Sequence, residues 1–190
     1  MVIGGLKLKL MAEDLLDTER SENTTLDEFM LQINPASIDL TIGAHFKKAV
    51  KSCDSVVYGF QGSSVKAERY YSNLFWKDRY EIGGYIPIAP GDAILAVTRE
   101  YIKMPNGVCG QIFTKSTLGR MFINHMMAGF VDPGFHGRLT LELVNDGKHS
   151  ILIPVGARIV QMILSRVDSG YAYDGRYQGA ETLECAKVMK

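Results

Sequence analysis

From Ile33 onward the chain consists of short apolar runs that alternate with polar residues or are rich in β-branched residues. Such runs favour half-buried β-strands, and the Gly, Pro, Asn and Asp residues between them favour tight turns. The turn sequences recur at residues 90–92, 105–107, 132–134, 145–147 and 154–156. Turns at this spacing predict a closed β-barrel or a jelly roll and not an open sheet.

The first thirty residues do not follow this β pattern. Their leucine spacing predicts a short helix at about 8–18, followed by a polar break at 21–25. A chain of 190 residues can bury the core of one domain, so we expect a single domain over 1–190. Within it, the weakly periodic residues 54–85 predict an excursion from the barrel. The Gly- and Tyr-rich segment 168–190 predicts a tail that could close over a ligand.

Charge and cysteine content exclude several classes of function. Lys plus Arg equals Asp plus Glu at 21 each, so no overall field attracts the chain to nucleic acid or to an anionic membrane. The three cysteines are far apart, which argues against a disulfide framework and suits a reducing compartment. The N-terminus does not resemble a signal peptide and no apolar run approaches a membrane span, so we expect a cytoplasmic protein.

The sequence also argues against zinc chemistry. Zinc-dependent nucleotide deaminases carry an H-x-E element and a P-C-x-x-C pair, and neither is present. The four histidines lack the close spacing of a zinc-binding helix. Any hydrolytic water must therefore be activated by side chains and not by a metal that the protein holds.

Glu142 is the strongest candidate for a catalytic group. It interrupts an apolar strand pattern in which three leucines share one face, while Thr140, Glu142 and Val144 share the other. Burial disfavours the charged form of a carboxylate and raises its pKa, which lets it take and return a proton near neutral pH. Considered alone, however, Glu142 is better explained as an edge-strand glutamate that faces water, because carboxylates with a shifted pKa are also often structural.

Residues 115–120, KSTLGR, follow a predicted strand and combine two cations with two hydroxyls. Lys115, Ser116, Thr117 and Arg120, beside a glycine that permits close approach of the backbone, suit a phosphate group. The alternative is a solvated turn in which Ser116 or Thr117 caps a short helix.

Residues 128–135, AGFVDPGF, form an apolar segment punctuated by glycine. Asp132 could accept a hydrogen bond from a sugar hydroxyl, and Phe135 could supply an apolar wall for a nucleoside. The same residues are also a good hairpin turn that needs no ligand. Because the KSTLGR loop, this segment and Glu142 fall within 28 residues, their combination favours a nucleotide site.

These stretches resemble the dCTP deaminases of the dUTPase-like superfamily. The resemblance rests on NPASIDLTIG at 34–43, KSTLGR at 115–120 and MAGFVDPGFHGRLTLELVN at 127–145, and it extends to the GRYQG element ending at residue 179. It implies a distorted β-barrel or jelly roll, assembly as a homotrimer or hexamer, and hydrolytic conversion of dCTP to dUTP and ammonia without zinc. Several members of the family also cleave dUTP to dUMP and diphosphate, so a bifunctional enzyme stays open.

Carried over by position, the resemblance implies a role for each matching catalytic residue. Glu142 would be the proton shuttle, and Ser116 and the main-chain carbonyl near Ala128 would hold the attacking water. Arg120 would orient Glu142 and bind near the substrate. Asp132 would accept from the 3′-hydroxyl of the deoxyribose.

The resemblance also implies how the phosphates are bound. Mg²⁺ would bind with the triphosphate near Asp39, and dTTP would be a feedback inhibitor. The side chains that would contact the nucleotide are Lys115, Ser116, Thr117 and Arg176 at the phosphates, Phe135 as an apolar wall, and Gln161 and Tyr171 as weaker correspondences.

The sequence departs from the family pattern at three residues. Lys115 replaces the usual arginine, Met127 replaces a threonine and Ala180 replaces a glutamine. The segment between Arg120 and Asp132 is also one residue shorter than usual. Two alternatives therefore stay open: a dUTP diphosphatase without deaminase activity, which Glu142 disfavours, and a non-catalytic nucleotide-binding regulator. The choice among dCTP, dCMP and a modified cytosine nucleotide is also open.

Overall fold

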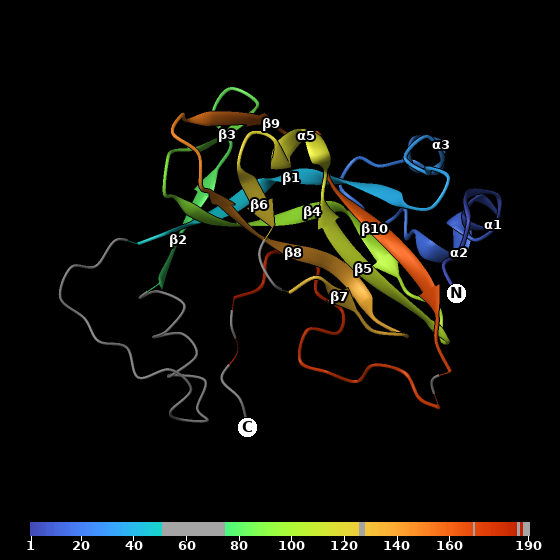
Figure 1. The fold of residues 1–190 in the computed structure, drawn as a ribbon. Helices are drawn as coiled ribbons and strands as arrows, with labels where there is room; N and C mark the ends of the chain where they lie inside the picture. Colours follow the sequence, from blue (N-terminus) through green and yellow to red (C-terminus); the bar gives the residue numbers. More distant parts are fainter. Residues whose placement is uncertain (51–74, 126–127, 169, 186, 188–190) are drawn as a thin grey trace.

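The computed structural model describes residues 1–50, 75–125, 128–168, 170–185 and 187, and most of its ordered elements are antiparallel strands (Figure 1). The helices are α1 (Gly5–Leu10), α2 (Ala12–Leu15), α3 (Leu26–Met30) and α5 (Ser116–Gly119). The strands are β1 (Ile38–Ala49), β2 (Trp76–Tyr80), β3 (Tyr85–Ile88), β4 (Ala93–Lys103), β5 (Val108–Thr114), β6 (Ile123–His125), β7 (Phe130–Val131), β8 (His136–Asn145), β9 (Ile151–Pro154) and β10 (Arg158–Arg166). The prediction of a mainly β fold is confirmed.

The main sheet is a curled half-barrel with the strand order β6-β8-β4-β1-β10-β5-β7, and β2 pairs with β1 outside this path. β3 and β9 form a separate two-stranded sheet. The curl brings the two ends of the main sheet together, because the backbone N–H of His125 in β6 donates to Thr114 Oγ1 at the end of β5 at 2.8 Å. Nearer the start of β5, Gly110 and Gln111 pair with β7. The distorted barrel or jelly roll expected from the sequence is confirmed in this form.

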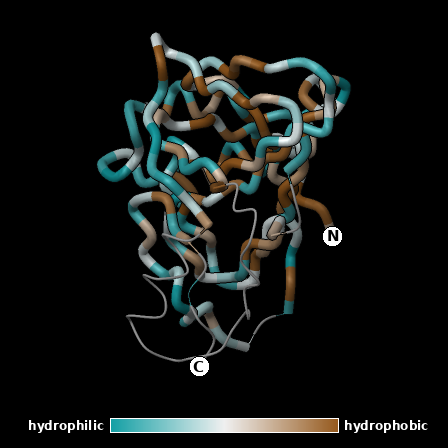
Figure 2. Tube along the Cα trace, turned by 90° about the vertical axis from the view of Figure 1, so that its left-hand side faces the viewer, coloured by the Kyte–Doolittle hydropathy of each residue, from teal (hydrophilic) through white to brown (hydrophobic). Residues whose placement is uncertain are grey.

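Alternating burial along the strands builds the core. In β8 every second residue is buried, so its three leucines enter the core while Thr140 and Glu142 lie on the other face. The alternation of hydrophobic and hydrophilic positions can be followed along the tube in Figure 2. The two faces predicted around Glu142 are therefore present.

The single helix predicted at 8–18 is wrong. The structure has α1 and α2 instead, separated at Met11, and α2 ends because Leu16 adopts an extended conformation and forms an antiparallel bridge with Ile102 of β4. A tertiary contact here overrides the local helical pattern. The polar break leads into α3, where Thr25 and Glu28 form a capping box.

The tail that follows β10 runs along β8 (Figure 1). Gly179 donates its backbone N–H to the carbonyl of His136 at 2.8 Å, and Arg138 donates to the carbonyl of Ala180 at 2.7 Å. Of the excursion predicted at 54–85, residues 54–74 lie outside the described residues, whereas β2 adds a strand beside β1. Within the described ranges, no helix is long and apolar enough to cross a membrane.

A buried carboxylate ties the start of β1 to β4. Glu100 is fully buried, and its carboxylate accepts hydrogen bonds from the Thr41 backbone N–H at 3.0 Å, the Thr41 hydroxyl at 2.6 Å and Gln32 Nε2 at 2.9 Å. Burial raises the pKa of Glu100, and the hydrogen bonds from Thr41 and Gln32 oppose that shift. Both Thr41 donors thus bond to one side chain, and Gln32 Nε2 also donates to the carbonyl of Asp39 at 2.7 Å.

We expect Glu100→Gln to lower the free energy of unfolding by about 1–3 kcal/mol, because the new amide nitrogen must face one of the three donors. Urea unfolding followed by circular dichroism, at equal protein concentrations, measures the difference. The matched control is Glu19→Gln, since Glu19 is exposed and its substitution should change stability by less than about 0.5 kcal/mol. Equal stability of the two variants would contradict the structural role of Glu100.

Candidate active site

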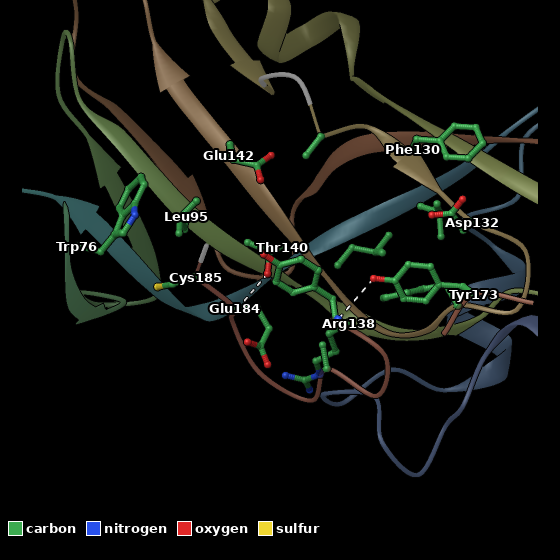
Figure 3. Close-up of a pocket in the computed structure, with 16 residues that line it drawn as sticks. Trp76, Leu95, Phe130, Asp132, Arg138, Thr140, Glu142, Tyr173, Glu184 and Cys185 are labelled. Atoms are coloured by element: carbon green, nitrogen blue, oxygen red, sulfur yellow. Dashed lines mark hydrogen bonds between the residues drawn. The ribbon is translucent and has the colours of Figure 1, made fainter. Parts of the chain in front are cut away.

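A cavity of about 410 Å³ lies between β8, the tail and the segment that precedes the turn at residues 132–134 (Figure 3). Its walls are mostly apolar and aromatic, which is the general form of a small-molecule site. The aromatic side chains are Trp76, Phe130, Phe135, Tyr173 and Tyr177. The polar side chains that converge on the same space are Asp132, Arg138, Thr140, Glu142 and Glu184.

Glu142 reaches the cavity through a gap at the edge of β8. Among the described residues, β6 pairs with β8 from Leu143 to Asn145, and the Thr140 hydroxyl accepts from the backbone N–H of the tail residue Glu184 at 3.1 Å. Residue 142 lies between these two partners. Figure 3 shows its carboxylate pointing into the cavity, with Trp76 on one side and Asp132 on the other.

The environment of Glu142 favours the neutral carboxyl. Its side chain is 35% exposed, and burial raises its pKa. Glu142 Oε2 is buried and has no hydrogen-bond partner within the described part of the chain, and His125 Nε2 lies 3.6 Å from it. Burial also lowers the pKa of His125. A carboxyl group poised in this way is suited to general acid–base chemistry.

The AGFVDPGF segment supplies part of the cavity wall, as the sequence suggested. Ala128, Asp132 and Phe135 all line it, and the ring of Phe135 packs edge-on against Tyr173 with 5.8 Å between ring centroids. The segment is held on β5 at Gly129, where an added Cβ would lie 2.9 Å from the carbonyl oxygen of Ile112. The hairpin turn at 132–134 is also present, so the turn and the wall are the same structure.

The KSTLGR loop does not line this cavity. It forms α5 at the opposite end of β5 from β7 (Figure 1), and Ser116, Thr117 and Arg120 are exposed there. The cap predicted at Ser116 or Thr117 is wrong, because the N-cap is Lys115, with extended backbone and no side-chain capping bond. The helix therefore starts at Ser116 itself.

Lys115 belongs to a second polar cluster, which we name the Asp39 cluster. Lys115 Nζ pairs with Asp39 Oδ2, and Arg158 Nη1 lies 3.9 Å from the same oxygen. The Asp39 side chain is only 2% exposed, and Gln161 lies opposite Asp39 in the ladder between β1 and β10. Three residues that the resemblance associated with the nucleotide and its magnesium, Asp39, Lys115 and Gln161, are thus gathered at one place, and none of them lines the cavity.

The tail contributes different residues from those expected. Tyr171 is exposed and Arg176 Nη1 donates to the carbonyl of Lys187 at 3.3 Å, and neither side chain lines the cavity. Tyr173 and Tyr177 line it instead. No local pattern distinguishes these tyrosines from the others in the tail.

Arg138 is a functional candidate that the sequence analysis missed. It lines the cavity, and its Nη1 lies 3.3 Å from Glu22 Oε2 in the N-terminal region. The signal was available, because Arg138, Thr140 and Glu142 occur at every second position of one strand and must share a face. This face carries the polar side of the cavity.

Comparisons with known proteins show which sequences this chain is similar to. A family model described as dCTP deaminase-like matches residues 10–167. A protein of Methanothermobacter thermautotrophicus named "dCTP deaminase, dUMP-forming" is 35% identical over 145 residues, which are 76% of this chain and 70% of that protein. A protein of the same name from Sulfurihydrogenibium sp. is 32% identical over 183 residues, 95% of this chain and 93% of its own length.

A solved structure shows the same fold. The crystal structure of 2′-deoxycytidine 5′-triphosphate deaminase from Agrobacterium tumefaciens aligns with a TM-score of 0.62 and 22% sequence identity. The alignment covers 87% of this chain and 48% of that chain, so this chain spans about half the length of the solved one.

Proposed function

This chain belongs to the dCTP deaminase family, and from that premise we propose that it is an enzyme that hydrolyses dCTP to dUTP and ammonia, with Glu142 as the proton shuttle. The observation that carries the proposal is the half-buried carboxylate of Glu142 in the wall of an apolar cavity of nucleoside size. A regulator that only binds nucleotides would need the cavity but not a carboxyl with a raised pKa.

In the proposed reaction, Glu142 takes a proton from water while the water oxygen bonds to the amine-bearing carbon of cytosine. Glu142 gives this proton to N3 of the ring, then takes the proton of the new hydroxyl and delivers it to the amino nitrogen. The carbon–nitrogen bond breaks, ammonia leaves and the carbonyl of uracil forms. Ala128 lines the same cavity, and the main-chain carbonyl near it would hold the water, while Asp132 would accept from the 3′-hydroxyl of the sugar.

Two other proposed catalytic residues, Ser116 and Arg120, would come from a neighbouring subunit. Both are exposed on α5 and lie outside the cavity of their own chain. Large exposed apolar side chains, such as Phe113 on β5 and Phe130 on β7, are 46% and 57% exposed. Exposed apolar groups on adjacent strands are typical of an interface between copies. We therefore propose a homotrimer, or a hexamer of two trimers, with each site built by two subunits.

Magnesium would be held by the nucleotide and not by a cage of side chains. Among the described residues, no group of three or more His, Cys, Asp and Glu side chains could hold a metal ion. The Asp39 carboxylate already has Lys115 as an ion partner, but its Oδ1 is buried without a hydrogen-bond partner in the described structure and could accept from a magnesium-bound water. Bound in this way, Mg²⁺ would neutralise phosphate charge.

The remaining proposed nucleotide contacts come from the helix α5 region, the sheet and the tail. They are Lys115, Ser116, Thr117, Gln161, Tyr171 and Arg176.

The names of the relatives favour a second step that converts dUTP to dUMP and diphosphate, and we propose this bifunctional reaction as the second candidate. Inhibition by dTTP and a cytoplasmic location complete the proposal.

Incubation of the purified protein with dCTP and Mg²⁺, followed by anion-exchange chromatography, tests the function. Accumulation of dUTP with one ammonia per nucleotide supports a monofunctional deaminase. Formation of dUMP and diphosphate with the same yield of ammonia supports the bifunctional enzyme. Unchanged dCTP contradicts the proposal, and release of diphosphate from dUTP without ammonia from dCTP would identify a dUTP diphosphatase.

A further inference from the structure

His125 and Glu142 approach each other at the wall of the cavity. His125 Nε2 and Glu142 Oε2 are both buried, lie 3.6 Å apart and have no hydrogen-bond partner among the described residues. The side chain of His125 is 2% exposed, so water does not reach most of its ring. Buried polar atoms are rarely left unpaired, which makes this pair a feature that needs an explanation.

The position of His125 is fixed by its backbone. Its N–H donates to the Thr114 hydroxyl at 2.8 Å, and His125 lies opposite Leu143 in the ladder between β6 and β8. The residue next to that ladder partner is Glu142. The sheet thus fixes the backbone of His125 one register position from Glu142, and with 3.6 Å between Nε2 and Oε2 a small adjustment of either side chain closes the contact to a hydrogen bond.

In the state that reacts, Glu142 is ionised so that it can take a proton from water, and for this state the chemistry of the pair decides which atom donates. Burial disfavours an imidazolium, so the ring is neutral and protonated on one nitrogen only. If the proton were on Nδ1, the lone pairs of Nε2 and of an ionised Oε2 would oppose each other. With the proton on Nε2, the ring donates to Oε2 and leaves the other carboxylate oxygen on the cavity side.

We propose that His125 is a positioning residue for the deamination, which donates from Nε2 to Glu142 Oε2 and so presents Oε1 of the same carboxylate to the attacking water. This inference rests on the proposed function of Glu142. The donated hydrogen bond also favours the ionised carboxylate that must accept the proton of water.

Other ionisable groups line the same cavity as Glu142. The tail supplies Tyr173, Tyr177, Glu184 and Cys185, the turn supplies Asp132, and β8 supplies Arg138. On β4 the residue opposite Glu142 is the uncharged Leu95. Burial is the main cause of the raised pKa of Glu142. A hydrogen bond donated to a carboxylate lowers its pKa, and removal of the donor therefore raises the pKa of Glu142 further.

His125→Phe tests the proposal, because it keeps a ring but removes the donor. We expect kcat for dCTP deamination to fall by about 10- to 100-fold with little change in KM. We also expect the acid limb of the pH profile of kcat to move up by about one pH unit, since activity is lost as pH falls through the pKa of Glu142. His125→Gln, whose amide can reach the position of Nε2, should recover most of both effects. His149→Phe, at an exposed histidine, is the matched control.

An active His125→Phe variant with an unchanged kcat and pH profile would overturn the inference and leave the proposed function intact. Absence of ammonia from dCTP with the unaltered protein would overturn the proposed function and the inference together. If His125→Phe does not fold, ¹⁵N NMR of the unaltered protein at pH 7 decides the question. A neutral Nε2–H tautomer of His125 supports the proposal, and an Nδ1–H tautomer or an imidazolium overturns it.

Discussion

Glu142→Gln is expected to abolish measurable deamination, with kcat lowered by about 10²- to 10⁴-fold. The amide keeps the shape of the side chain but cannot take a proton from water and return it to the leaving nitrogen. Binding should persist, since the apolar walls and Asp132 are unchanged. Ammonia release from dCTP measures the first effect, and calorimetric titration with dCTP and Mg²⁺ measures the second.

The matched control for this variant is Glu184→Gln. Glu184 lines the same cavity, but it contacts β8 through its backbone N–H, and its carboxylate pairs with Lys187 at 3.0 Å. We expect its substitution to change kcat by less than about tenfold. Undiminished ammonia release from Glu142→Gln would remove Glu142 from the mechanism, and a loss of nucleotide binding would show that its main role is structural.

Two inactive variants are expected to restore activity to each other when they assemble together. Arg120→Ala should be inactive because the guanidinium near the substrate is lost, and Glu142→Gln because the shuttle is lost. In a mixed trimer, the Arg120→Ala chain supplies Glu142 and its Glu142→Gln neighbour supplies Arg120, so random assembly at equal amounts makes about one quarter of the sites intact. Co-refolding of the two chains, followed by the ammonia assay, measures the restored fraction.

The control pair combines Glu142→Gln with Asp132→Asn. Both residues line the cavity of a single chain, so no mixed assembly contains a site in which both are intact. Activity restored in neither mixture would contradict a site shared between subunits. Activity restored in both mixtures would show instead that subunits exchange whole segments.

The parts of the site that the sequence predicted are those that local structure brings together. Glu142 was identified from a two-residue alternation that holds along one strand. Asp132 and Phe135 follow from a single turn, whose geometry places them on the same wall. Their roles in binding and catalysis remain proposals.

The parts that the sequence did not predict depend on contacts between distant segments. Trp76 and Tyr177 meet at one cavity although about a hundred residues separate them. The pairing of Lys115 with Asp39 joins the end of β5 to β1, and Leu16 leaves the helical conformation to bridge β4. Local propensity carries no information on such contacts. The two wrong predictions, the single helix at 8–18 and the helix cap at Ser116 or Thr117, both concern segments that make such contacts.

The strand order has a consequence for the rate at which the protein reaches its native state. In the path β6-β8-β4-β1-β10-β5-β7, no two neighbours are consecutive along the chain. The first strand of the sheet pairs with the last, β10, across more than a hundred residues. Long loops must close before these contacts form. Conformational entropy of the chain is therefore lost before the stabilising contacts between the strands are made. We expect slow refolding, with no hairpin of the main path able to act as a local nucleus.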